Sequence, residues 1–435
     1  MMRLPQDFTE KYTKLLAAEA PAFFETFGAD AISAFRTNPL KENQKEFSDK
    51  IPNMNWSYYG KVSGKSPEHV TGLVYSQEPA AQMVGQVAQP RKGMKVLDLA
   101  AAPGGKSTHL LSYLENTGLL VSNEISSKRS KILVENIERF GARNVVVTNE
   151  SADRLAAVFP AYFDMIVLDA PCSGEGMFRK DPSAMEYWDS SYPEKCAILQ
   201  REILASAMKM LAPGGELIYS TCTWSPEENE EIVTWLLENY DLQLLPIHKI
   251  NGMVEGIGYP QTARMYPHHF KGEGQFVAKF SYLGRQEPKK IKAGKTNLNR
   301  EQSQLWNEFI ETNLTVALDG LLQVFGEQLY LQPKGLPDLS KVRIARNGLH
   351  LGTFKKKRFE PSFALGLSLT SKEVARQIEI SEEDFGRYVA GNTLSVSKDL
   401  PNGWYQVSVN GNGLGFAKVV AGVLKNSFPK GLRFQ

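Results

Sequence analysis

The sequence predicts an α/β fold with a doubly wound, mostly parallel sheet. Between residues 95 and 280, short apolar runs alternate with amphipathic stretches of helical period, an order typical of parallel sheets. The predicted strands cover 95–99, 119–123, 145–148, 165–169 and 216–220, and the predicted helices cover 107–114, 126–140 and 194–211. Because such sheets bind ligands at the carboxyl ends of their strands, we expect the functional residues there.

Segments of different character flank this unit. The N-terminal segment begins with a helical pattern formed by Phe8, Tyr12, Leu15 and Leu16. Residues 285–300 are basic without an apolar period, 305–325 has a helical pattern, and the remainder mixes short strands with turns such as 410–411. We therefore expect an N-terminal domain over 1–72, a central domain over 73–284, a basic linker over 285–304 and a β-rich C-terminal region over 305–435.

The composition excludes several classes of protein. No apolar stretch approaches the ~20 residues of a membrane span, and the first residues do not have the pattern of a secretory signal. The three cysteines are odd in number and too few for a disulfide scaffold. We expect a cytoplasmic protein with free thiols.

The net charge of +2 is unevenly distributed. Residues 285–300 carry six Lys or Arg against the single acid Glu287, and residues 341–359 carry seven and no acid. The rest of the chain is therefore net acidic. A polyanion would be attracted to the C-terminal part, although each basic run alone is also compatible with a solvated loop.

A glycine-containing turn joins the first predicted strand to the next helix. Residues 98–108 read Asp-Leu-Ala-Ala-Ala-Pro-Gly-Gly-Lys-Ser-Thr. Glycines allow a close approach of the backbone to a ligand, and a helix start offers free N–H groups. A phosphate loop would need a glycine at Ala100, and the dinucleotide fingerprint G-x-G-x-x-G is absent. A phosphate loop and a tight turn without function are thus minor alternatives.

An acidic residue, Glu124, follows the second strand. At that distance from the glycine turn, its carboxylate suits a bidentate hydrogen bond to a ribose diol. A helix N-terminal charge without further function is the other interpretation.

Thiols follow the ends of two later strands. The strand ending at Asp169 runs into Pro171 and Cys172, and the strand ending at Ser220 runs into Cys222. Residues 225–228, Ser-Pro-Glu-Glu, have the pattern of a capping box, which would place Cys222 just before a helix N-terminus, where a thiolate is favoured. Two thiols beside a strand-end carboxylate indicate nucleophilic chemistry more than packing.

The remaining cysteine and the metal ligands carry less information. Cys196 lies in a helical apolar pattern and is interpreted as a core residue. The sequence has no zinc-ligand spacing of cysteines and histidines, so we expect no metal.

Together these motifs resemble the RNA cytosine-C5 methyltransferases of the Sun/Nop2 family, in particular the bacterial RsmF-type enzymes that act on 16S ribosomal RNA. The resemblance covers essentially the whole chain. Its markers are the segments 36–41 (Arg-Thr-Asn-Pro-Leu-Lys), 77–79 (Gln-Glu-Pro), 101–106, 169–174, 220–223, 264–268 (Arg-Met-Tyr-Pro-His) and 413–426.

The resemblance implies a Rossmann-like class I methyltransferase domain with a mostly parallel seven-stranded sheet, a small N-terminal domain and a PUA-like, RNA-binding C-terminal region. It implies S-adenosyl-L-methionine as cofactor and RNA, 16S ribosomal RNA or the small ribosomal subunit, as partner. Cys222 would be the nucleophile, Cys172 would assist product release, and Asp169 would lie near the methyl group and the cytosine. The residues implied to bind the cofactor are Ala100, Ala101, Ala102, Pro103, Gly104, Gly105, Lys106, Glu124, Asp169 and Pro171.

The chain departs from the family pattern at two positions. Ala100 stands where many relatives have a cysteine, which the chemistry does not need. Ser151 stands where an acid is expected for the adenine amino group, and Glu150 or Asp153 are the possible substitutes.

Three other functions stay open. An enzyme that methylates exocyclic amino groups would share the cofactor half but need no thiol. A nucleotide hydrolase would rest on Gly105-Lys106-Ser107 alone, and an RNA-binding protein without catalysis would leave both cysteines and Asp169 unexplained.

Overall fold

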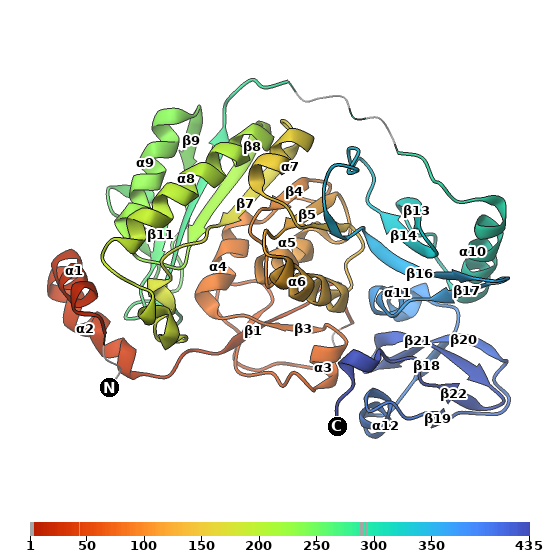
Figure 1. The fold of residues 1–435 in the computed structure, drawn as a ribbon. Helices are drawn as coiled ribbons and strands as arrows, with labels where there is room; N and C mark the ends of the chain where they lie inside the picture. Colours follow the sequence, from red (N-terminus) through yellow and green to blue (C-terminus); the bar gives the residue numbers. More distant parts are fainter. Residues whose placement is uncertain (1–3, 43, 288–290, 292–293) are drawn as a thin grey trace.

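The computed structural model describes residues 4–42, 44–287, 291 and 294–435. A central sheet is covered by helices on both faces, with the N-terminal helices on one side and two small β-rich units on the other (Figure 1). No helix among the described residues is long and apolar enough to span a membrane.

The N-terminal segment combines short helices with a small antiparallel sheet. Helices α1 (Gln6–Leu16) and α2 (Ala20–Glu25) are joined by the 3-10 turn η1 (Ala17–Glu19). Strand β1 (Ala34–Thr37) pairs with β2 (Ser57–Tyr59) and β3 (Val74–Ser76), with α3 (Pro67–Val70) before β3. Helix α4 (Pro79–Ala88) then leads into the central sheet.

The central sheet has 10 strands in the order β10-β11-β12-β8-β7-β4-β5-β6-β15, with β9 paired to β12. It is larger than the seven strands predicted. Its middle strands pair in parallel: β6 (Val145–Thr148), β5 (Leu119–Asn123), β4 (Lys95–Asp98), β7 (Phe163–Asp169) and β8 (Leu211–Thr221). The antiparallel additions are β9 (Leu242–Leu245), β10 (Val254–Gly256), β11 (Tyr259–Met265), β12 (Gln275–Tyr282) and β15 (Ile344–Arg346).

Both faces of the parallel strands are buried. Along β7, Met165 and Val167 belong to one core cluster, whereas Ile166 and Leu168 belong to the other. This explains why the strands are continuous apolar runs rather than alternating ones. The covering helices are α5 (Gly105–Leu114), α6 (Ser127–Phe140), α7 (Ala152–Val158), α8 (Tyr192–Met210) and α9 (Glu230–Asn239).

The C-terminal region contains two further sheets. One pairs β13 (Leu321–Phe325), β14 (Gln328–Gln332), β16 (Leu349–Lys355) and β17 (Arg358–Pro361), with α10 (Arg300–Asn313) and α11 (Phe363–Ser368) nearby. The other has the order β18 (Gln377–Glu379), β20 (Gly403–Val409), β21 (Asn412–Val420), β22 (Val423–Lys425) and β19 (Leu394–Ser395), with α12 (Glu382–Val389).

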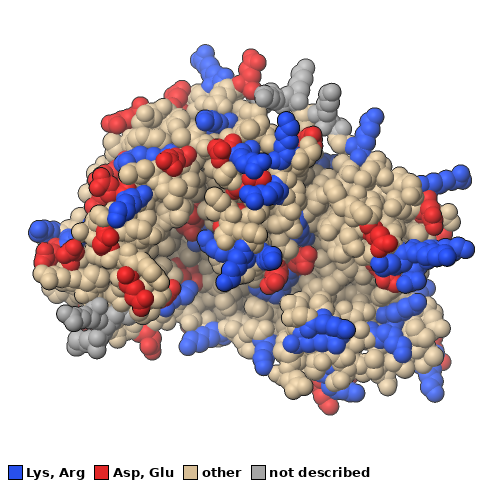
Figure 2. Space-filling model, in the orientation of Figure 1, with Lys and Arg blue, Asp and Glu red and all other residues tan. Residues whose placement is uncertain are grey.

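One expectation for this region was wrong. The predicted helix over 305–325 ends at Asn313, and Leu321–Phe325 is a strand, because a hairpin with β14 pairs its backbone. Most basic residues of the run over 341–359 are exposed, whereas the Arg346 guanidinium is buried and donates to the carbonyl oxygens of Val145 and Ala142. Three lysines of the first run, Lys289, Lys290 and Lys292, lie outside the described residues. Figure 2 shows Lys and Arg side chains in the middle of one face and over the C-terminal region.

Candidate active site

The unusual strand-end residues meet at the point where the strand order reverses. The chain runs from β4 outward to β5 and β6, then returns to β7 and β8 on the other side of β4. A cavity of about 300 Å³ lies at these carboxyl ends, as expected for a doubly wound sheet. It is lined by Leu99, Ala100, Ala102, Asn123, Glu124, Ile125, Arg129, Glu150, Ser151, Ala152, Asp169, Ala170, Pro171, Cys172, Ile203 and Cys222.

The two thiols lie side by side on neighbouring strands. The Sγ atoms of Cys172 and Cys222 are 3.2 Å apart, because Asp169 of β7 is in register with Ser220 of β8. Both cysteines are free and partly exposed. Their contact raises the pKa of the Cys172 thiol well above its ordinary value, and burial adds to the effect. Cys172 therefore keeps its proton at neutral pH.

Asp169 is surrounded by donors. Its Oδ1 accepts hydrogen bonds from Ser220 Oγ at 2.7 Å and Gln275 Nε2 at 3.0 Å. Its Oδ2 lies 2.5 Å from Lys106 Nζ at the start of α5. Burial opposes the charge on Lys106, but the Asp169 carboxylate and the nearby Cys222 raise its pKa. The positively charged Lys106 side chain is therefore held near the cysteine thiols.

The α-helix expected to begin at Pro226, shortly after Cys222, begins later in the chain. A 3-10 turn at Pro226–Glu228 comes first, and α9 begins only at Glu230. The predicted capping box does not form, because Ser225 Oγ donates to Glu227 and the Glu228 carboxylate accepts from Ser173 N. The loop is held instead by Gly176 N, which donates to the Cys222 carbonyl oxygen at 2.9 Å.

The glycine turn is held in part by residues of the N-terminal segment. Arg36 is buried and donates to the Gly105 carbonyl oxygen at 2.8 Å and to Gln77 Oε1 at 2.8 Å. Gly104, the N-cap of α5, has a φ of +117°, a conformation that L side chains rarely adopt. These contacts give the segments 36–41 and 77–79 a supporting role.

The turn residues do not all face the cavity. Ala100 and Ala102 line it, Ala101 N donates to the Asn123 carbonyl oxygen, and the Pro103 carbonyl oxygen accepts from Asn136. Lys106, predicted to bind the cofactor, forms an ion pair with Asp169, which lines the cavity.

Glu124 has the position that a ribose-binding acid needs. It is buried directly after β5 and lines the cavity. Its Oε1 accepts a hydrogen bond from Ser126 N at 2.9 Å, which also makes it a partner of the start of α6. Its Oε2 lies 3.6 Å from Arg129 NH1 and can accept a further hydrogen bond. The donor and acceptor chemistry therefore fits an adenosine-type ligand.

A segment of the C-terminal region, just before β15, contacts one of the residues that line the cavity. Glu150 and Ser151 line it, and the Glu150 carboxylate accepts from the backbone N of Arg343 at 3.0 Å. Arg343 Nε also lies 3.4 Å from Glu150 Oε1, and its carbonyl oxygen accepts from Asn149 N. Among the described residues, Glu150 Oε2 has no hydrogen-bond partner.

The chain is similar to known proteins along most of its length. The family model described as 16S rRNA methyltransferase RsmB/F matches residues 85–281. Models of the N-terminal domain of 16S rRNA methyltransferase RsmF, the RsmF rRNA methyltransferase first C-terminal domain and the methyltransferase RsmF PUA domain match 4–79, 308–369 and 375–434.

Full-length relatives agree. Ribosomal RNA small subunit methyltransferase F of Shewanella loihica is 34% identical over 433 residues, which cover 92% of this chain and 88% of the relative. The chain belongs to the RsmF family of 16S rRNA methyltransferases. The protein of the same name from Erwinia tasmaniensis is 33% identical over 386 residues, covering 85% and 80% of the two chains.

Membership in the RsmF family confirms the resemblance drawn from the motifs. The chain is an S-adenosylmethionine-dependent RNA methyltransferase with a Rossmann-like domain and a PUA domain. A solved structure described as a methyltransferase homolog protein from Pyrococcus horikoshii is 28% identical, with a TM-score of 0.57, and covers 65% of this chain and 96% of that one.

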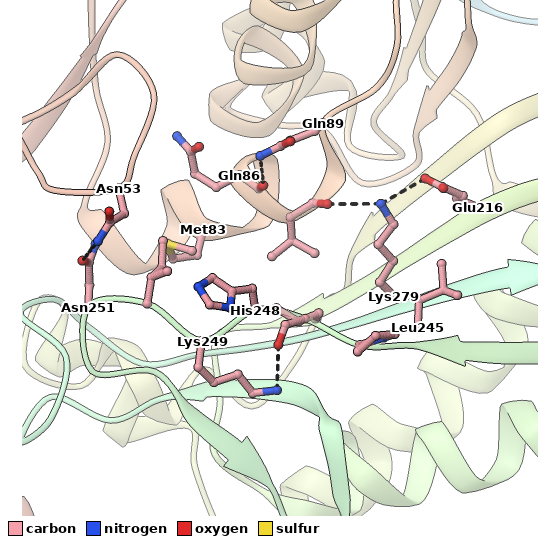
Figure 3. Close-up of a pocket in the computed structure, with 14 residues that line it drawn as sticks. Asn53, Met83, Gln86, Gln89, Glu216, Leu245, His248, Lys249, Asn251 and Lys279 are labelled. Atoms are coloured by element: carbon pink, nitrogen blue, oxygen red, sulfur yellow. Dashed lines mark hydrogen bonds and ion pairs between the residues drawn. The ribbon is translucent and has the colours of Figure 1, made fainter.

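A larger cavity, of about 900 Å³, lies away from the thiols and between α4 and the segment that follows β9 (Figure 3). Its polar side chains mainly contact one another or the backbone. Lys279 Nζ lies 3.1 Å from Glu216 and 3.4 Å from the Val87 carbonyl oxygen, and Lys249 Nζ donates to the Ile247 carbonyl oxygen. In this RsmF-family chain, the two thiols and Asp169 at the strand ends therefore line the smaller cavity and not this larger one.

Two partners of the site were missed by the sequence reasoning. The first is Gln275, which belongs to β12. The second is the buried Glu175, whose carboxylate accepts hydrogen bonds from Thr223 Oγ1 at 2.7 Å and from the Tyr12 hydroxyl. The polar Glu273–Gln275 stretch at the start of an otherwise apolar strand was the available signal for the first.

Proposed function

We propose that the protein transfers a methyl group to C5 of a cytosine in 16S ribosomal RNA through a covalent bond between Cys222 Sγ and C6 of the base. The observation that supports this is the pair of thiols, 3.2 Å apart, beside Asp169 at the end of the cofactor cavity. The RNA substrate follows from the family, and the names of the relatives specify the small-subunit RNA. Such a substrate agrees with the expected cytoplasmic location.

The thiol solves a problem of reactivity. A ring carbon of cytosine is too weak a nucleophile to take a methyl group directly, so a covalent step divides the reaction into easier ones. The Cys222 thiolate forms a bond to C6, and the electrons of the C5–C6 double bond move to C5. S-adenosylmethionine supplies the methyl group that C5 then takes. Loss of the C5 proton restores the double bond and breaks the bond between sulfur and C6.

Asp169 and Lys106 would orient the base. Because Asp169 already accepts from Ser220, Gln275 and Lys106, its carboxylate acts as an acceptor, suited to the exocyclic amino group of cytosine. Lys106 Nζ would donate to the N3 and O2 side and stabilise negative charge that develops there.

Cys172 would act on the departing sulfur. Since its pKa is raised by the contact with Cys222 and by burial, it can donate its S–H to Cys222 Sγ as the bond to C6 breaks. A protonated thiol does not take up the C5 proton, which leaves the Asp169 carboxylate or water as the base.

The remaining cavity residues would hold the cofactor. We assign the methionine portion to the turn around Ala100 and Ala102, the ribose to Glu124, and the adenine to the end formed by Glu150 and Ser151. The cytosine must leave its stack to reach the thiols, so an unpaired or flipped nucleotide is the expected target.

Covalent trapping tests the assignment. Cys222→Ala should abolish turnover and any covalent complex, whereas Cys172→Ala should accumulate a protein–RNA adduct with S-adenosylmethionine and 16S RNA, seen as a band that resists denaturation. Cys196→Ala is the matched control and should retain activity. Adduct formation by Cys222→Ala and its absence in Cys172→Ala would reverse the two roles. Bisulfite mapping of RNA from cells with and without the protein would locate the cytosine.

A further inference from the structure

Three potential metal ligands converge at the contact between the N-terminal helices and the central domain. Glu19 ends η1, whereas His268 and His269 lie in the loop between β11 and β12. His268 Nε2 is 3.0 Å and His269 Nε2 is 2.8 Å from the same atom, Glu19 Oε2. The three ligand atoms all lie within 4.8 Å of one another.

The two imidazole rings are crowded against one carboxylate oxygen. The ring centroids of His268 and His269 are only 4.1 Å apart, so two charged imidazoles would repel each other. If both rings are neutral, both must carry their proton on Nε2 and share one carboxylate oxygen. A bound cation would satisfy all three atoms at once.

We propose that Glu19, His268 and His269 form a binding site for a divalent transition-metal ion of the zinc type. Two imidazole nitrogens and one carboxylate oxygen suit zinc, whereas calcium and magnesium prefer oxygen ligands. His268 is 5% exposed and fixes the site, while His269 and Glu19 are 38% and 56% exposed and leave room for water as a further ligand. The expectation from the sequence was no metal, because no zinc-ligand spacing of cysteines and histidines was found; this cluster joins residues that are far apart in the chain.

The ion would act as a structural clip. The His268 ring packs against Phe23 of α2, with centroids 5.7 Å apart, in the aromatic cluster that joins the N-terminal helices to Trp224 and Tyr266. Coordination of Glu19 would tie that cluster to the loop after β11. The clip is independent of the proposed methyl-transfer mechanism, since its residues do not line the cofactor cavity.

The test must exclude the thiols, because Cys172 and Cys222 are close enough to bind zinc themselves. We would therefore use the full chain with Cys172→Ser and Cys222→Ser as background. Zn²⁺ binding is measured by calorimetry, and Co²⁺ binding by the visible absorption that reports ligand geometry. We expect one ion per chain and a rise in the melting temperature on adding Zn²⁺.

Glu19→Gln and His269→Ala should each weaken Zn²⁺ binding at least ~10-fold and remove the thermal shift. These positions are exposed enough for the variants to fold, which their melting temperature without metal would check. The exposed His248, which is outside the cluster, provides the control His248→Ala, with binding unchanged. The proposal would be overturned if the background protein bound no Zn²⁺. It would also be overturned if Zn²⁺ bound with unchanged affinity to both the Glu19→Gln variant and the His269→Ala variant.

Discussion

Glu228 is a buried carboxyl whose ionisation should lower the free energy of unfolding by a measurable amount. It is 0% exposed beneath the cysteine loops. Its Oε2 accepts from Ser173 N and Gln200 Nε2, each at 2.9 Å, whereas its Oε1 has no hydrogen-bond partner within the described part of the chain. Burial raises the pKa of Glu228 to about 7, and the nearby Glu175 carboxyl contributes.

The sign of the pH dependence follows from the two pKa values. The unfolded chain loses this proton near pH 4.5, and the folded protein keeps it until about pH 7. The stabilisation is therefore complete below pH 4.5, is lost as the pH rises to about 7, and stays lost above it. One pKa unit corresponds to about 1.4 kcal/mol, so the total loss is about 3 kcal/mol.

Glu228→Gln removes this titration. Between pH 4.5 and pH 8, the melting temperature of the variant should therefore rise relative to that of the wild-type protein by about 6 °C or more for a domain of this size. Differential scanning calorimetry of the central-domain transition measures the difference.

Glu227→Gln is the matched control at the adjacent position. Burial disfavours the charge on Glu227, but hydrogen bonds from Ser225 and Lys11 outweigh it and lower its pKa. Its stabilisation is present above pH 4.5 and is lost only below it, so the Glu227→Gln difference should stay nearly flat between pH 4.5 and pH 8. Parallel curves of melting temperature against pH for wild type and Glu228→Gln would refute the reasoning.

Three further substitutions test the assignments around the cavity. Lys106→Met should lower kcat by ~100-fold or more while the Kd for S-adenosylhomocysteine changes little. A large rise in that Kd would show that Lys106 binds the cofactor. Glu124→Ala should raise the Kd by about 10- to 100-fold in calorimetry, because a hydrogen bond to a charged group is lost; an unchanged Kd would leave Glu124 as a helix partner only. Arg343→Ala removes only the Nε contact with Glu150 and keeps the backbone hydrogen bond, so the Kd should rise by about 3-fold; Arg358→Ala, an equally exposed arginine that pairs with Glu360, is the control, and equal effects of the two variants would exclude a local role.

The strands and their chemistry could be predicted because local pattern decides them. The strands at 119–123 and 145–148 match β5 and β6, and α6 has Ser126 as N-cap and Gly141 as C-cap, as the sequence indicates. Cys172 and Cys222 come together because parallel strands end at one edge, which the order of elements already implies.

The errors arise where distant segments decide the structure. Leu321–Phe325 has an apolar pattern compatible with a helix, but Gly320 and Gly326 bracket it and pairing with β14 makes it a strand. Gln275 reaches Asp169 across 106 positions of the chain, and Arg343 reaches Glu150 across 193. A local pattern can mark such a residue, as the polar Glu273–Gln275 stretch marks Gln275, but it does not identify the partner, because the partner depends on which strands become neighbours.

The site depends on segments from both ends of the chain. On the N-terminal side, the Tyr12 hydroxyl and Thr223 both donate to the buried Glu175, so α1 reaches the residue next to Cys222. On the C-terminal side, β15 pairs with β6, and Arg343 holds the Glu150 end of the cofactor cavity. The methyltransferase segment at 85–281 contains both thiols and the cofactor turn, but it lacks both of these supports. The flanking regions therefore contribute to the geometry of the proposed reaction site.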